Sequence, residues 1–222
     1  MITLKSAREI EAMDRAGDFL ASIHIGLRDL LKPGVDMWEV EEYVRRRCKE
    51  ENVLPLQIGV EGSIMDYPYA TCCSLNDEVA HAFPRHYILN DGDLLKVDMV
   101  LSEPIDKSVL DVSKLDFDNV AQVKKYTESY AGGLADSCWA YAIGTPSDEV
   151  KNLMEVTREA MYLGIEQAVV GNRIGDIGAA IQEYAESRGY GVVRDLVGHG
   201  VGPTMHEEPM AVSYTHLRAH ET

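Results

Sequence analysis

DLLKVDMVL at positions 93–101 and GLADSCWAYAIG at positions 133–144 decide the fold, because each stretch has the composition of a β-strand and each carries one aspartate. Alternate residues of a strand share a face. If the two strands pair as a hairpin, Asp98 and Asp136 repel one another unless a divalent cation lies between them. Taken singly, each aspartate is more often a solvent-facing residue or a turn anchor, so the pair points to a metal only together with further ligands.

The further ligands come from GHGVGPTMHEEP at positions 198–209, which holds two histidines among three glycines. Glycine allows tight turns and close approach to a ligand. A lone histidine is usually a core or surface residue, but His199 and His206 in such a segment favour a site. Carboxylate and imidazole donors from distant segments suit Mn, Fe, Co and Zn. The sequence therefore predicts a catalytic divalent-metal site.

Length, charge and cysteine content indicate which kinds of protein this chain can be. The chain has 222 residues, enough for one sizeable core, and we expect one domain. Its formal charge of −16 argues against a general affinity for nucleic acid or membrane surfaces. Four cysteines without a paired framework are typical of reduced thiols in the cytoplasm. No secretory leader or membrane-spanning run is expected.

Two helices are predicted near the start of the chain. The segment Ser6 to Glu9 has the pattern of a capping box, and helical spacing of apolar residues follows until Pro33. Asp36 begins a second, shorter helix that runs to about Glu50.

The same order is predicted again further on. A long helix starts at Thr145-Pro146 with proline at its first position, and a shorter one starts at Asp176. A shift of 140 residues aligns Asp36 with Asp176. This indicates duplicated halves, although two amphipathic helix pairs also align by chance.

The two aspartate-bearing strands are separated by a polar, glycine-free insertion at about 102–130. We expect a surface excursion that neither lines the metal site nor completes the core, with a lid or docking element as the alternative. The end of the chain, 211–222, has neither periodicity nor turn signals and is predicted to be an unrelated tail. Its pair His216 and His220 lacks the context of a zinc motif.

Other chemistries have weaker support. Cys72 and Cys73 could supply a nucleophile, but no electropositive helix start lies nearby, so a thiol hydrolase is a distant alternative. No phosphate loop or dinucleotide fingerprint is present in the sequence. His81, in NDEVAHAFP after a predicted strand, carries no weight alone.

Together, NDEVAHAFP, KVDMV, LADSCW and GHGVGPTMHEEP, with the paired helices, resemble the bacterial type I methionine aminopeptidases from near the N-terminus to about Met210. The resemblance implies an α+β, pita-bread fold, in which two pseudo-symmetric halves of helix pair and antiparallel sheet surround the site. It also implies metal-assisted removal of the initiator methionine. The domain would cover 1–210.

Residue by residue, the resemblance implies three groups of functional side chains. The metal ligands would be Asp98, Asp136 and His199. The catalytic residues would be His81 and His206, which also contact substrate, and the pocket for the methionine side chain would be formed by Tyr67, Cys72 and Met205.

The same resemblance implies two divalent metal ions (Co, Mn, Fe or Zn), nascent polypeptide N-termini as substrate, the ribosome as a further partner, and a cytoplasmic monomer. The insertion is similar to that of streptococcal-type members. The family continues after HEEPM into strands that bring two further glutamate ligands, whereas AVSYTHLRAHET stands here. We therefore expect a truncated member whose second half is incomplete and whose activity is impaired.

Two alternatives stay open. One is a non-catalytic peptide or ribosome-associated binding module of the same fold. The other is a relative of the proline-specific peptidases, which normally carry an additional N-terminal domain, whereas the helix pair begins here at Ser6.

Overall fold

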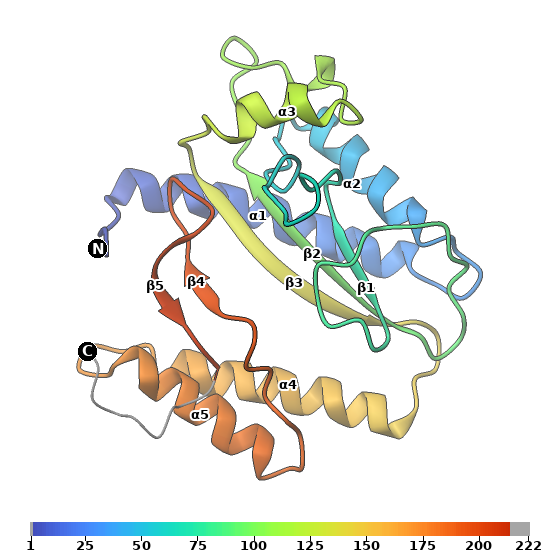
Figure 1. Cartoon of the computed structure of the whole chain (residues 1–222), viewed down its shortest axis with the longest axis vertical. Helices are drawn as coiled ribbons and strands as arrows, with labels where there is room; N and C mark the ends of the chain where they lie inside the picture. Colours follow the sequence, from blue (N-terminus) through green and yellow to red (C-terminus); the bar gives the residue numbers. More distant parts are fainter. Residues whose placement is uncertain (1, 214–222) are drawn as a thin grey trace. The chain divides into compact units, whose positions relative to one another are not determined.

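The computed structural model describes residues 2–213, which form two compact units (Figure 1). The first unit comprises residues 4–146 with 201–205. The second comprises residues 147–200 and 206–213, together with residues 2 and 3. Within the part of the chain that the structure describes, no helix is both long enough and apolar enough to cross a bilayer.

Two helices open the first unit, as the sequence predicts. Helix α1 spans Ala7–Leu30 and begins with a capping box, in which the Glu9 carboxylate accepts a hydrogen bond from the Ser6 backbone N–H at 2.7 Å. Helix α2 spans Trp38–Glu50. The Asp36 carboxylate accepts from the Trp38 N–H at 3.1 Å and so satisfies a donor at the start of α2.

The sheet of the first unit is antiparallel, in the order β1 (Cys72–Leu75), β2 (Leu94–Ser102), β3 (Leu134–Ala142). Strand β2 lies in the centre and pairs with β3 along its whole length. The predicted hairpin of the two aspartate-bearing strands is confirmed. Helix α1 runs along one face of this sheet (Figure 1).

A buried histidine fastens α1 to β3. His24 has no exposed surface, and its ring nitrogens lie 2.7 Å from Tyr141 Oη and 3.0 Å from Ser137 Oγ. The imidazole stacks on Trp139 with ring centroids 4.7 Å apart. Burial lowers the pKa of His24 to about 4. Because Ser137, Trp139 and Tyr141 alternate along β3 on the α1 side, Asp136 is on the opposite face.

The insertion between β2 and β3 is part of the core, so the prediction of a purely surface excursion is wrong. It contains a short 3₁₀ helix, η1 (Val112–Lys114), and helix α3 (Val120–Thr127). Asn52 satisfies its backbone: Asn52 Nδ2 donates to the carbonyls of Ile105 at 2.6 Å and Leu110 at 2.8 Å, and its Oδ1 accepts from the N–H of Val112 at 2.8 Å. Four apolar side chains of the insertion join the main core: Val112, Leu115, Phe117 and Val123.

The second unit pairs two helices, α4 (Asp148–Glu166) and α5 (Ile174–Glu186), with two strands, β4 (Gly198–Gly200) and β5 (Glu207–Ala211). The helices approach closely at Gly164, where a Cβ would lie 2.8 Å from Ile181 Cδ1. Pro146 is not the first helical residue. Ser147 is the N-cap instead, because its hydroxyl accepts from the Val150 N–H at 3.2 Å.

A long helix followed by a 13-residue helix therefore occurs in both units. The shift of 140 residues does not align equivalent positions, since Asp36 precedes α2 whereas Asp176 lies within α5. Ala211, the first residue assigned to the tail, ends β5. His216 and His220 lie outside the described residues.

Candidate metal and peptide site

The two aspartates lie diagonally across neighbouring strands. In the register of β2 with β3, Asp98 is opposite Cys138 and Asp136 is opposite Val100. Diagonal neighbours on one face have Cα atoms about 7–8 Å apart, with their Cβ atoms somewhat closer. Asp98 is half-buried and Asp136 is exposed. The carboxylates thus share the sheet face that α1 leaves open, at a separation that a cation can bridge.

Cys72 lies on the same face, because β1 places it opposite Asp98. Burial, with the Asp98 carboxylate as a smaller contributor, raises the pKa of the Cys72 thiol to about 12. Cys72 is therefore a neutral thiol at physiological pH. This disfavours the thiol-hydrolase alternative, because the thiolate is the nucleophilic form.

Tyr67 belongs to an aromatic cluster that the sequence analysis missed. Its hydroxyl donates to the carbonyl of Thr71 at 3.0 Å. Its ring meets Phe83 edge-on at 5.2 Å and Tyr69 at 6.2 Å between centroids. The only sequence signals were the YPY and HAFP stretches, whose aromatic residues become neighbours through folding.

His81 has an unusual backbone conformation in the irregular segment that follows β1, six residues after the strand ends at Leu75. Its φ of +59° lies in the left-handed region, which non-glycine residues seldom adopt. The following residue, Ala82, is fixed because its carbonyl accepts from the Cys73 N–H at 2.9 Å. The His81 side chain is exposed. A constrained residue of this kind is typical of a functional position.

His199 and His206 come together in the second unit. Their rings meet at 4.4 Å between centroids with an interplanar angle of 63°. The β4–β5 pairing shifts register between His199 and Gly200. A Cβ at Gly200 would lie 2.8 Å from the carbonyl oxygen of Glu208, so this irregular strand pairing requires glycine. Met205, by contrast, belongs to the first unit and packs against its core.

The structure thus groups the predicted residues by unit. Asp98, Asp136, Tyr67, Cys72, His81 and Met205 lie in the first unit, and His199 and His206 lie in the second. Within residues 2–213, no three His, Cys, Asp or Glu side chains gather closely enough to hold a metal ion. The carboxylate pair and the imidazole pair nevertheless have the donor chemistry of a divalent transition-metal site.

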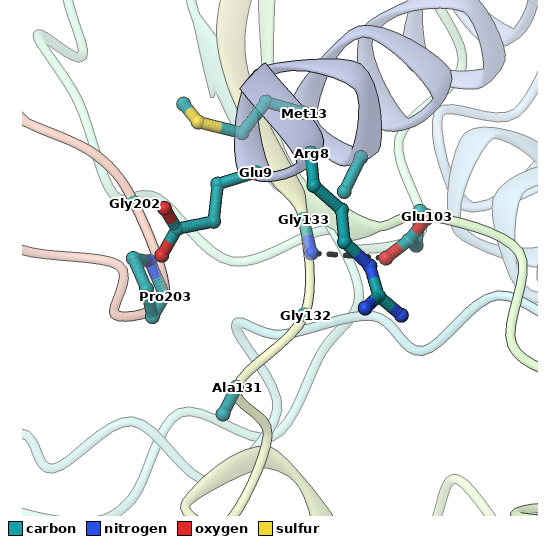
Figure 2. A pocket seen from close by; sticks show the side chains of 10 residues that line it. Arg8, Glu9, Met13, Glu103, Ala131, Gly132, Gly133, Gly202 and Pro203 are labelled. Carbon is teal, nitrogen blue, oxygen red and sulfur yellow. Dashed lines mark hydrogen bonds between the residues drawn. The ribbon is translucent and has the colours of Figure 1, made fainter. Parts of the chain in front are cut away.

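A cavity of about 270 Å³ in the first unit is separate from these residues (Figure 2). It lies between the start of α1, Gly132 and Gly133, and Pro203. Glu103 lines it, but the Glu103 carboxylate is engaged by the Gly133 N–H at 3.1 Å and by Arg15. None of the predicted site residues lines this cavity.

Comparison with known proteins decides the family. The family model described as metallopeptidase family M24 matches residues 11–102 and 125–222. The chain belongs to metallopeptidase family M24. The model leaves out 103–124, which lies within the insertion predicted from the sequence.

Curated relatives in the M24 family are bacterial methionine aminopeptidases. The enzyme of Clostridium acetobutylicum is 36% identical over 215 residues, a match that covers 96% of this chain and 74% of that protein. Methionine aminopeptidase 1 of Bacillus subtilis is 34% identical, with the same two coverages.

Solved structures of methionine aminopeptidases also match this chain. A methionine aminopeptidase from Streptococci, described as having a novel structural motif, is 87% identical with a TM-score of 0.88, covering 96% of this chain and 75% of that one. The Thermotoga maritima enzyme is 32% identical with a TM-score of 0.78, covering 96% and 74%. Prolidase from Pyrococcus furiosus, at 19% identity and a TM-score of 0.70, covers 95% and 52% and shares the fold alone. The expected α+β, pita-bread fold is confirmed.

Proposed function

We propose that this chain is a metal-dependent methionine aminopeptidase that hydrolyses the bond after the initiator methionine of nascent polypeptides. The observation that carries the proposal is the shared sheet face of Asp98, Asp136 and Cys72, in a chain 36% identical to a methionine aminopeptidase. Two carboxylates and a neutral thiol on one open face suit a cation next to an apolar substrate side chain.

Asp98 and Asp136 would hold the metal, and His199 would supply an imidazole. Two divalent ions, from among Co, Mn, Fe and Zn, complete the proposal. When bound, such ions polarise a peptide carbonyl and provide a nucleophile at neutral pH. Without the cation, the two carboxylates repel one another, so the protein's contribution is to hold both charges on one face.

His206 would donate a hydrogen bond to the oxygen of the scissile carbonyl as negative charge develops on it. His81 would contact the scissile amide. The left-handed backbone at His81 fixes the direction in which its side chain leaves the irregular segment after β1.

Tyr67, Cys72 and Met205 would form the pocket for the methionine side chain. Tyr69 and Phe83, which lie against Tyr67, extend the proposed pocket. Sulfur makes favourable contacts with aromatic rings, so an aromatic wall next to a neutral thiol suits a thioether side chain.

The partners of the proposed enzyme are nascent polypeptide N-termini, with the ribosome as the place of encounter. We further propose a cytoplasmic location and a monomeric state.

The proposal is tested by release of methionine from Met-Ala-Ser by metal-stripped protein supplied with Mn, Co or Fe. We expect slow release, because the sequence predicts impaired activity, that depends on the added metal and falls when Leu-Ala-Ser replaces Met-Ala-Ser. Asp98→Asn should abolish it, whereas Asp148→Asn, at a side chain 96% exposed on α4, should not. Absence of release with all three metals would contradict the proposal.

A further inference from the structure

We propose that the 103–124 segment, which the family model leaves out, positions the substrate pocket through two polar contacts, made by Lys124 and Asp118. Both contacts converge on residues 66–71, the stretch that contains Tyr67 and leads into Cys72. The inference rests on the proposed function, because it takes Tyr67 and Cys72 as pocket residues.

Lys124 holds one end of this stretch. Its ammonium lies 2.7 Å from the carboxylate of Asp66, the residue before Tyr67, and both side chains are about one-third exposed or less. The lysine also packs on Gly59, where a Cβ would lie 2.7 Å from Lys124 Cβ. Gly59 in turn donates its N–H to the Tyr67 carbonyl at 2.8 Å. Lys124 therefore touches both sides of the turn that presents Tyr67.

Asp118 acts on the middle of the stretch through Arg45 of α2. The Asp118 carboxylate accepts from Arg45 Nη1, while Arg45 Nη2 donates to the carbonyl of Pro68 at 3.3 Å. The Arg45 side chain is 16% exposed and Asp118 is 84% exposed. Asp118 thus fixes, from the surface, a guanidinium that contacts the residue after Tyr67.

The same guanidinium pairs with the buried carboxylate of Glu41. Glu41 accepts from the Ala70 N–H at 2.8 Å and from the Thr71 hydroxyl at 2.6 Å. Arg45 is therefore the junction between the surface residue Asp118 and the backbone that leads into Cys72. A shift of this guanidinium would also disturb a buried carboxylate, which is costly to leave without a partner.

The two contacts differ from the apolar packing of the segment. Val112 and its buried neighbours stabilise the core as a whole, whereas Lys124 and Asp118 make polar contacts to one short stretch. A segment that served only to stabilise the core would need the apolar packing but not the polar contacts. Substitutions that keep side-chain volume but remove charge separate the two roles.

The test compares Lys124→Met and Asp118→Asn with Lys114→Met in the full chain. Lys114 is a matched control, because it is in the same segment, 80% exposed and paired only locally with Asp111. Amide hydrogen exchange is measured at Gly59, Tyr67 and Ala70. We expect exchange at these amides to be about twofold to fivefold faster in the two test variants, as loss of a partly exposed ion pair implies, and unchanged in the control.

A second measurement is the hydrolysis of Met-Ala-Ser. If the pocket is loosened, KM should rise severalfold with little change in kcat. Unchanged exchange in both test variants would overturn the inference, as would equal acceleration in Lys114→Met. Faster exchange with unchanged KM would overturn the link to the pocket. The exchange measurement needs no activity, so its failure is distinct from failure of the proposed function.

Discussion

At the scale of single residues, the carboxylates of Asp98 and Asp136 occupy one sheet face across directly paired strands. We expect Asp98→Asn and Asp136→Asn each to weaken Mn binding on the order of tenfold or more, because each removes a negative charge next to the cation. Titration calorimetry measures the affinity, with Asp148→Asn as control. If both variants bound Mn with the wild-type affinity, the two carboxylates would not be metal ligands.

His206 is predicted to act mainly in the transition state. His206→Ala in the Mn-loaded protein should lower kcat for Met-Ala-Ser on the order of 10²-fold while changing KM little, because the negative charge that it stabilises develops only during reaction. Steady-state kinetics give both constants. A loss confined to KM would instead make His206 a residue that binds the ground state.

At the scale of elements, the contact between α1 and β3 should make stability depend on pH. The folded pKa of His24, about 4, lies below the ordinary value of 6.5, so the unfolded chain binds more protons between these values. His24 therefore contributes stability that is present above pH 6.5 and is lost as the pH falls toward 4. From pH 7 to pH 5 the loss should be about 2 kcal/mol.

Urea unfolding at the two pH values measures this loss. His24→Gln removes the titrating ring, so the variant should lose less stability than the wild type over the same interval. An equal loss in wild type and variant would assign the pH dependence to other groups.

The insertion provides a second prediction at this scale. Val112→Ala should lower the free energy of unfolding by about 2 kcal/mol, because Val112 is fully buried and its truncation leaves a cavity. Val109→Ala is the matched control, since Val109 is 80% exposed in the same segment. Equal stability of the two variants would restore the view of the insertion as a surface excursion.

These elements also show how far the sequence predicts the fold. Helices α1 and α2 and the β2–β3 pair were predicted because caps and apolar periodicity are short-range signals. The burial of Val112 was missed because it depends on a contact that is distant in the sequence. Asn52 accepts a hydrogen bond from the Val112 N–H and so holds this part of the insertion against the core. The predicted start of α4 at Pro146 was wrong because Ser147, whose hydroxyl accepts from the Val150 N–H, is the N-cap.

The candidate site divides in the same way. The residue types at Asp98, Asp136, His199 and His206 carry the chemistry and could be named from sequence alone. The diagonal placement of the aspartates depends on strand register. The contact of Tyr67 with Phe83 depends on how the chain between them folds back. The spacing of residues in the sequence predicts neither the placement of the aspartates nor this ring contact.

At the scale of the whole molecule, the net charge of −16 attracts cations toward the protein and so increases its affinity for them. We expect the affinity for Mn to fall severalfold when KCl is raised from about 0.01 M to about 0.1 M, because the screening length shortens from about 30 Å to about 10 Å. Titration at the two salt concentrations tests this. An affinity independent of salt would confine the electrostatic contribution to the direct ligands.

The position of the insertion also affects how the chain assembles. Strands β2 and β3 meet with Ser102 opposite Leu134, so their pairing must close a connection of about 30 residues instead of a two-residue turn. Each doubling of a flexible loop adds about 0.6 kcal/mol of closure entropy, which over four doublings is about 2 kcal/mol. Docking of the 103–124 segment on Asn52 shortens the effective loop. Weakening that docking would therefore slow refolding of the central hairpin as well as lower the stability of the finished sheet.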